Sequence, residues 1–270
     1  MNENVSPQTV GTERQYSLVK ILGIWVAAAV PMAILGWAAH PALAVRSGPL
    51  GSAVIRVILM TVGLVWQFVL SMIVVYREEG NLRWSTIRRR FWLNKPPDPK
   101  SGEPRGRLWL WLIPLALLLA AFEFLVAPAL NGAWIQVLPF FAEPPQFSMS
   151  PVLESADVQA QLVGAWWFLA LFIVMAVFNV FLGEEFLFRG VLLPKMEGTF
   201  GKWDWVVNGV LMGAYHWHQP WGIPGNIVSA VLFFAFPAKR FRCTWIAVIL
   251  HSLQYLLVIP MILALVLGLA

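Results

Sequence analysis

Charged residues are scarce in this chain. They make up 12% of its 270 residues, whereas hydrophobic residues make up 59%. A soluble domain usually carries about twice this share of charge, so the composition excludes a soluble globular protein. The high apolar content excludes a disordered chain as well. We therefore predict an integral membrane protein, whose direct partners include membrane lipids.

Cysteine is almost absent, since Cys243 is the only one in the chain. A single cysteine excludes an internal disulfide, and neither a Cys-x-x-Cys pair nor a His-Glu-x-x-His motif is present to predict zinc locally. The net charge of +5 is typical of membrane proteins with basic cytoplasmic loops. We therefore predict no nucleic-acid partner.

Long apolar runs divide the chain. At about 1.5 Å per residue, roughly 20 apolar residues cross the hydrocarbon core of a bilayer. The runs that meet or approach this length are 18–39, 51–76, 108–130, 162–193, 203–217, 223–238 and 244–270. Pro260 interrupts the last run and can split it into two helices. We predict an all-α fold, a polytopic membrane helical bundle of seven or eight transmembrane helices.

Basic residues alternate between the predicted loops. Loop 77–107 contains nine Lys and Arg residues, whereas loop 131–161 contains none. Cytoplasmic loops collect Lys and Arg, so we predict a cytoplasmic tail over 1–17, a single transmembrane domain over 18–270 and a cytoplasmic location for loop 77–107. The plasma membrane of a bacterium is the preferred location. The sequence does not predict an oligomeric state.

The fourth apolar run contains three ionisable residues, Glu184, Glu185 and Arg189. Each costs at least about 2.5 kcal/mol at membrane depth and therefore needs a partner or a function. On an α-helix Glu185 and Arg189 are four residues apart and can pair along one face, whereas Glu184 points about 100° away from Glu185. We predict that Arg189 neutralises Glu185 and that Glu184 faces the bundle interior as a base.

Histidines follow on two later helices. His216 comes after Gly209 and Gly213, whose four-residue spacing lets a neighbouring helix approach closely, and His251 lies in the last apolar run. His218 lies about 200° from His216 on a helix, so one site can use both only if the helix ends between them. We expect His218 at the outer surface.

The order of these residues resembles a known motif series. Glu184-Glu185-x-x-x-Arg189, then His216, then His251 is similar to the motifs of the CAAX protease and bacteriocin-processing (CPBP, or Abi) family of intramembrane endopeptidases, including its type II CAAX prenyl endopeptidase branch. The resemblance implies a catalytic core over about 162–259. It also implies a membrane-associated protein or peptide substrate, with lipidated CAAX-type proteins among the candidates.

The chain departs from the family pattern at two positions. Met212 stands in for the Phe of the second motif, Phe-x-x-x-His. In the third motif, His-x-x-x-Asn/Asp, His251 matches but Tyr255 occupies the Asn/Asp position, with Gln254 beside it. If the family's Asn helps to hold the oxyanion, the hydroxyl of Tyr255 or the amide of Gln254 must substitute for it.

Two hydrolytic mechanisms fit these residues. Peptide hydrolysis needs an activated water and donors to the oxyanion. In the first mechanism Glu184 activates the water, His216 orients it, and His251 holds the oxyanion together with Gln254 or Tyr255. In the second, Glu184, His216 and His251 bind one divalent metal, such as zinc, in a site with two His and one Glu. The sequence leaves both open.

Two other functions remain as alternatives to an endopeptidase. A catalytically inactive membrane scaffold of the same fold is one, because Tyr255 departs from the motif. A small proton-coupled transporter is the other, because Glu, His and Arg in membranes also form proton relays. Transporters of that kind usually contain internal repeats, and none is visible here.

Three expectations concern where polar residues lie. We expect Glu184, His216 and His251 to converge on one water-accessible cavity that opens to the cytoplasmic side, because burying each separately would cost more than sharing partners. His40 precedes Pro41 at a predicted outer boundary and is expected at the interface. Glu123 lies mid-span and can either join the site or pair with Arg56, and of these we favour the structural role.

Overall fold

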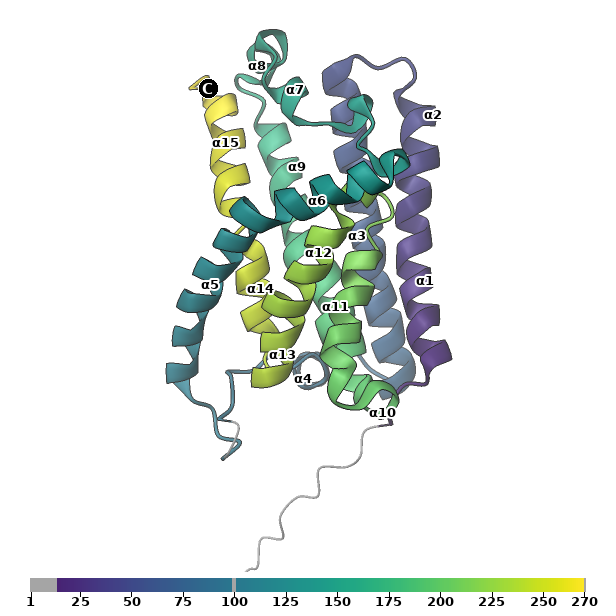
Figure 1. The fold of residues 1–270 in the computed structure, drawn as a ribbon, viewed down its shortest axis with the longest axis vertical. Helices are drawn as coiled ribbons and strands as arrows, with labels where there is room; N and C mark the ends of the chain where they lie inside the picture. The colour runs from purple at the N-terminus through teal and green to yellow at the C-terminus, as the bar shows by residue number, and fades with distance from the viewer. Residues whose placement is uncertain (1–13, 99–100, 270) are drawn as a thin grey trace, which may run out of the picture.

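The structure is a computed structural model that describes residues 14–98 and 101–269 (Figure 1). Within these residues the elements are all helical, apart from an isolated bridge between Pro97 and Pro104. The predicted all-α class is confirmed. Residues 1–13 of the predicted cytoplasmic tail, and Lys100 of the predicted basic loop, lie outside the described residues.

The first half of the chain forms two long spans and then a bent third one. Its elements, with π- and 3-10-helical turns labelled η, are α1 (Leu18–Ile34), η1 (Leu35–Ala39), α2 (His40–Ala44), α3 (Pro49–Glu79), α4 (Trp84–Arg90), η2 (Gly106–Trp111), α5 (Leu112–Ala121), η3 (Phe122–Val126), α6 (Ala127–Val137), η4 (Pro139–Phe141) and η5 (Pro145–Phe147).

The second half contains all of the candidate site residues. Its elements are α7 (Ser150–Leu153), α8 (Ala156–Leu162), α9 (Trp166–Val177), η6 (Phe178–Gly183), η7 (Phe186–Leu192), η8 (Leu193–Lys195), α10 (Glu197–Phe200), η9 (Gly201–Trp203), α11 (Asp204–Ala214), η10 (Pro220–Gly222), α12 (Ile223–Ser229), η11 (Ala230–Ala235), α13 (Phe236–Phe241), α14 (Thr244–Ser252) and α15 (Tyr255–Leu267).

Six of the seven predicted runs correspond to candidate spans. Within the described residues, five helical stretches are long and apolar enough to cross a membrane, and α14 with α15, bent by 41°, makes up to six. The seventh run, 203–217, forms the shorter α11, whose 11 residues end at Ala214. The last run is broken between Ser252 and Tyr255 rather than at Pro260, which lies inside α15.

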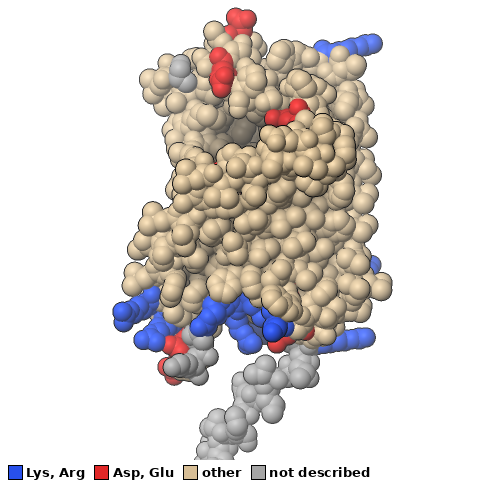
Figure 2. Space-filling view, in the orientation of Figure 1, with Lys and Arg blue, Asp and Glu red and all other residues tan. Residues whose placement is uncertain are grey.

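The two ends of the bundle differ in charge. In Figure 1, α4, α10 and α13 lie at one end, and α7, α8 and the C-terminus lie at the other. Figure 2 shows Lys and Arg gathered at the α4 and α13 end, whereas acidic side chains predominate near α7 and α8. The division of the molecule therefore follows the alternation of basic loops in the sequence.

The packing of α11 depends on two glycines. A Cβ atom added to Gly209 would lie 2.5 Å from the Cα of Val231, and one added to Gly213 would lie 2.5 Å from the Cα of Ile227. Any side chain would therefore push α11 away from α12 and η11. The close approach predicted from the spacing of the two glycines is confirmed, and it holds the end of α11 against the site.

The fourth span is not a regular α-helix. Its π-helical turns, η6 and η7, flank Glu184 and Glu185, and such turns occur frequently at functional sites. Gly183 lets this region pack on α3, because a Cβ there would lie 2.9 Å from the carbonyl oxygen of Leu64. The two glutamates are thus held where the helix is locally widened and tightly packed.

Candidate active site

Glu185 is the anionic partner in a buried ion pair. Glu184, Glu185 and Arg189 are 2%, 0% and 0% exposed. Oε2 of Glu185 lies 3.3 Å from Nε of Arg189, and the guanidinium also donates a hydrogen bond of 3.0 Å to the carbonyl of Ala230. The structure therefore contains the pair that four-residue spacing suggested, although the local helix is π-helical.

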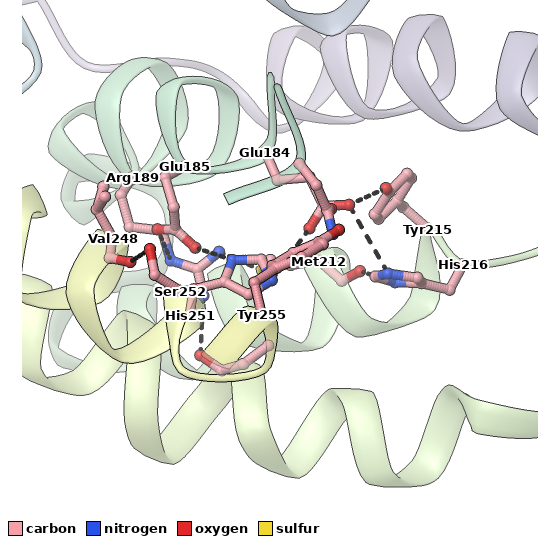
Figure 3. Close-up of polar contacts among 12 residues, drawn as sticks. Glu184, Glu185, Arg189, Met212, Tyr215, His216, Val248, His251, Ser252 and Tyr255 are labelled. Atoms are coloured by element: carbon pink, nitrogen blue, oxygen red, sulfur yellow. Dashed lines mark hydrogen bonds and ion pairs between the residues drawn. The ribbon is translucent and has the colours of Figure 1, made fainter. Parts of the chain in front are cut away.

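Glu184 is contacted by a tyrosine hydroxyl and faces two histidines instead. The hydroxyl of Tyr215 donates a hydrogen bond to its Oε1 (Figure 3). Nε2 of His216 lies 3.9 Å from Oε1, and Nε2 of His251 lies 3.9 Å from Oε2. Among the described residues, no Lys or Arg is within ion-pair distance of Glu184. One buried carboxylate thus faces two imidazoles that arrive from separate segments.

Each imidazole is held by a hydrogen bond at its Nδ1, the ring nitrogen that does not face Glu184. Nδ1 of His216 lies 3.0 Å from the carbonyl oxygen of Met212, and Nδ1 of His251 lies 3.0 Å from Oε1 of Glu185. A carbonyl and a carboxylate only accept, so each Nδ1 is the donor and each Nε2 is turned toward Glu184. The ring of His251 also stacks on Phe234, with centroids 4.6 Å apart. These contacts set both the orientation and the tautomer.

These groups border one cavity of about 510 Å³. The polar residues that line it are Glu123, Asn179, Glu184, His216, Gln219, Asn226, Ser229, His251 and Gln254. Among the described residues, no Lys or Arg belongs to its lining. The expected opening at the basic end is therefore not seen, because the lining runs toward Gln219 and Leu257, away from that end. Figure 2 also shows the surface hollowed in the half away from the basic end.

Tyr255 and Gln254 occupy different positions. Gln254 lines the cavity that contains Glu184 and also a neighbouring one of about 420 Å³, whereas Tyr255 lines only the neighbouring one. The hydroxyl of Tyr255 accepts a hydrogen bond of 2.9 Å from Nδ2 of Asn179. Asn179 itself lines the cavity with Glu184. Tyr255 therefore reaches the site through Asn179, and Gln254 reaches it directly.

Residues 165–257 match the family model described as type II CAAX prenyl endopeptidase Rce1-like. This segment of the chain is therefore similar to that family. The match contains all seven residues that the sequence put forward as site residues, and it confirms the family resemblance that their motifs carried. Searches of the curated proteins and of the solved structures gave no significant match.

Sequence reasoning missed three contacts in the Rce1-like segment. Tyr215 was overlooked because a continuing helix would turn it about 100° from His216, whereas α11 ends at Ala214. The sequence does not predict that Asn179 lines the cavity with Glu184, because a residue five positions earlier lies on a different face of an α-helix but close to one turn away on a π-helix. The hydrogen bond from His251 to Glu185 joins residues 66 apart, and no local spacing signals it.

Two histidines expected near the membrane surface are buried, and Glu123 lies at the cavity. His218 is buried rather than at the outer surface, with its ring centroid 5.3 Å from that of His216. His40 is buried as well, and its Nε2 lies 3.1 Å from the carbonyl oxygen of Ser52. Glu123 lines the cavity and accepts a hydrogen bond of 2.5 Å from Ser229.

The donor atoms suit zinc by type but not by arrangement. Ligands on a tetrahedral zinc with bonds near 2.0–2.1 Å lie about 3.3 Å apart, whereas both Nε2 atoms are 3.9 Å from the Glu184 carboxylate. Among the described residues, no group of three or more His, Cys, Asp or Glu side chains is placed to hold a metal ion. As they are placed, the described residues therefore do not fit a zinc site.

Proposed function

We propose that this protein is an intramembrane endopeptidase that hydrolyses a peptide bond of a membrane-associated protein or peptide, with lipidated CAAX-type proteins as the candidate substrate class. The Rce1-like match of residues 165–257 supports protease activity. The observation that carries the proposal is Glu184, a buried carboxylate without a cationic partner that faces two oriented imidazoles in a cavity.

The base in this proposal is Glu184. A separation of 3.9 Å between Oε1 and Nε2 of His216 is too long for a hydrogen bond and suits a bridging water. Glu184 takes one proton from that water while His216 orients it, and the hydroxide oxygen attacks the scissile carbonyl. When the tetrahedral intermediate collapses, the C–N bond breaks and Glu184 returns its proton to the leaving amine nitrogen. The hydrogen bond from Tyr215 holds the carboxylate in position and leaves Oε2 open to the cavity.

The developing oxyanion is held by His251 and amide groups. When both ring nitrogens of His251 carry protons, Nδ1 donates to Glu185 and Nε2 donates into the cavity. Gln254 and Asn179 add amide donors at the same wall. Glu185 is then more than the partner of Arg189, because it orients His251 and balances the positive charge of its ring.

Turnover of quenched fluorogenic peptides by the purified protein in nanodiscs tests the proposal. The panel contains matched peptides with and without a prenylated cysteine. Glu184→Gln should lower turnover by about 10²- to 10⁴-fold, as loss of a general base does. Glu123→Gln is the matched control, because it removes another carboxyl group from the same cavity and should leave most turnover. A folded wild type without turnover on any peptide would favour an inactive scaffold.

We also propose that the basic end and the N-terminus face the cytoplasm of a bacterial plasma membrane. Burial raises the pKa of the Cys243 thiol to about 11, so the wild-type chain should react little with thiol reagents near neutral pH. Against this background, Gln146→Cys should react with an impermeant maleimide on intact cells. Ser101→Cys should react only after lysis. The reverse pattern would overturn the orientation.

A further inference from the structure

A second cavity lies at the basic end, separate from the catalytic one. Its volume is about 430 Å³, and its lining consists of Trp84, Arg88, Leu93, Asn94, Lys95, Trp109, Trp245 and Ile249. The two cavities share no lining residue. They lie on opposite faces of α14, since Ile249 lines this one while Leu250 and His251 line the other.

The cations of this cavity lie at the basic end of the bundle, and its apolar side chains lie further along the membrane spans. Trp109 lies in the short helix η2 and Trp245 in the first turn of α14, where two candidate spans begin. Ile249 lies one turn deeper along α14. Arg88 and Lys95 belong to α4 and the segment after it, at the basic end of the bundle (Figure 1). The cavity therefore changes from cationic to apolar along the direction in which a membrane changes from headgroups to acyl chains.

The charge of the lining is of one sign. Arg88 and Lys95 are both exposed, no Asp or Glu lines the cavity, and neither cation has a carboxylate partner among the described residues. Some other cations at this end are paired, as in the 2.5 Å contact between Arg89 and Glu79. Two unpaired cations above three tryptophan rings complement an anionic, amphipathic ligand.

The floor of the cavity is rigid. The amide nitrogen of Thr244 donates to the carbonyl of Trp92 at 3.1 Å, Nδ2 of Asn94 donates to the carbonyl of Arg242 at 3.2 Å, and Sγ of Cys243 donates to the carbonyl of Asn94 at 2.9 Å. Trp92 also has φ of 50°, a conformation that is uncommon for a bulky residue and persists only when its surroundings enforce it. The site is thus formed before a ligand arrives.

We propose that this cavity binds one anionic phospholipid of the membrane leaflet at the basic end. The phosphate contacts Arg88 and Lys95, and the upper part of one acyl chain lies against Trp109, Trp245 and Ile249. A volume near 430 Å³ holds a headgroup and the adjoining methylenes, while the rest of the chain continues into the bilayer. Lipid is favoured over an acidic peptide because the apolar wall lies where two spans enter the membrane.

Native mass spectrometry of the full chain released from micelles tests the proposal. Phosphatidylglycerol and phosphatidylcholine with identical acyl chains are titrated against the wild type, the double variant Arg88→Gln/Lys95→Gln, and the control Arg77→Gln/Arg83→Gln. The control removes the same charge from exposed positions of the same end that do not line the cavity. Thermal unfolding with each lipid is the second readout.

The wild type should retain one phosphatidylglycerol in preference to phosphatidylcholine, and that lipid should raise its unfolding temperature. The double variant should bind phosphatidylglycerol roughly 10- to 30-fold more weakly, from about two basic contacts, while the control should match the wild type. Free glycerol phosphate should give no thermal shift. Equal losses in the two variants, no preference between the lipids, or tight binding of a soluble acidic peptide at this cavity would overturn the proposal.

Discussion

Two glutamates stand side by side at two places in the chain, Glu78-Glu79 and Glu184-Glu185. In the first pair, at the basic end of the bundle, both carboxylates have cationic partners. Glu78 lies 2.5 Å from Nζ of Lys20 and 2.8 Å from the guanidinium of Arg90, and Glu79 lies 2.5 Å from Arg89 and 3.4 Å from Nε of Arg90. Both carboxylates are about one-fifth exposed. Every charge has a close partner, so this pair joins the N-terminal segment to α3 and α4 and has no group left for chemistry.

The pair in the fourth span is fully buried and has one guanidinium for two carboxylates. Arg189 pairs with Glu185 at 3.3 Å, while Glu184 keeps only a hydroxyl donor and two imidazoles at 3.9 Å. The same dipeptide is therefore structural at one place and chemically available at the other. What distinguishes them is the number of cations within reach and the depth of burial of the two carboxylates.

Removal of the buried guanidinium should have the largest effect on stability. Arg189→Met leaves two carboxylates buried without a cation, and breaking such a pair costs about 3–5 kcal/mol. Arg89→Met at the basic end removes a guanidinium that is 55% exposed and should cost less than about 1 kcal/mol. Thermal unfolding in detergent compares the two variants. Similar losses would show that burial does not separate the two pairs.

Removing a tyrosine hydroxyl should lower turnover at the buried glutamate pair but not at the pair of the basic end. Tyr215→Phe removes the hydrogen bond to Glu184, and a bond to a charged group is worth about 1.5–3 kcal/mol, so turnover should fall roughly 10- to 100-fold. Tyr16→Phe removes the hydroxyl that accepts from Arg90 at 3.0 Å and should leave turnover unchanged. Full activity in Tyr215→Phe would remove Tyr215 from the site.

The smallest effect is expected for a carboxylate at the basic end. Hydrogen bonding to Lys239 at 2.8 Å, together with its charge, lowers the pKa of Glu197. The stabilisation is therefore present above the ordinary pKa of the carboxyl and is lost as the pH falls through the lowered value. Because Glu197 is 61% exposed, Glu197→Gln should cost less than about 1 kcal/mol at pH 7, and this cost should shrink as the pH falls through the lowered pKa. A larger stability difference between the wild type and Glu197→Gln near pH 3 than at pH 7 would contradict this pH dependence.

The spans could be predicted because hydrophobicity reports membrane burial directly. Runs 51–76 and 108–130 lie inside the candidate spans Pro49–Glu79 and Gly106–Val137. The length of α11 could not be predicted, because its apolar residues continue past Ala214 into a turn. The kink near Ser252 was equally hidden, since Pro260 was the visible helix breaker and α15 accommodates it.

The site was predictable where the partners are close in sequence or follow a motif. The pairing of Glu185 with Arg189 comes from a four-residue spacing, and His216 and His251 come from the family pattern. Tyr215 and Asn179 required a helix end and a π-helical turn. The sequence does not indicate either feature, because the position of a helix end or a π-helical turn within an apolar run depends on which backbone hydrogen bonds form.

The division of roles between the two buried glutamates is tested most directly by two variants measured side by side. Turnover and unfolding temperature are recorded for Glu184→Gln and Glu185→Gln in the same nanodisc preparation. We predict that Glu184→Gln loses turnover while its unfolding temperature is equal to or above that of the wild type, because a buried charge without a cation is removed. Glu185→Gln should unfold several degrees lower, because Arg189 loses its carboxylate. Near wild-type turnover in Glu184→Gln, or a greater loss of stability there than in Glu185→Gln, would contradict the account.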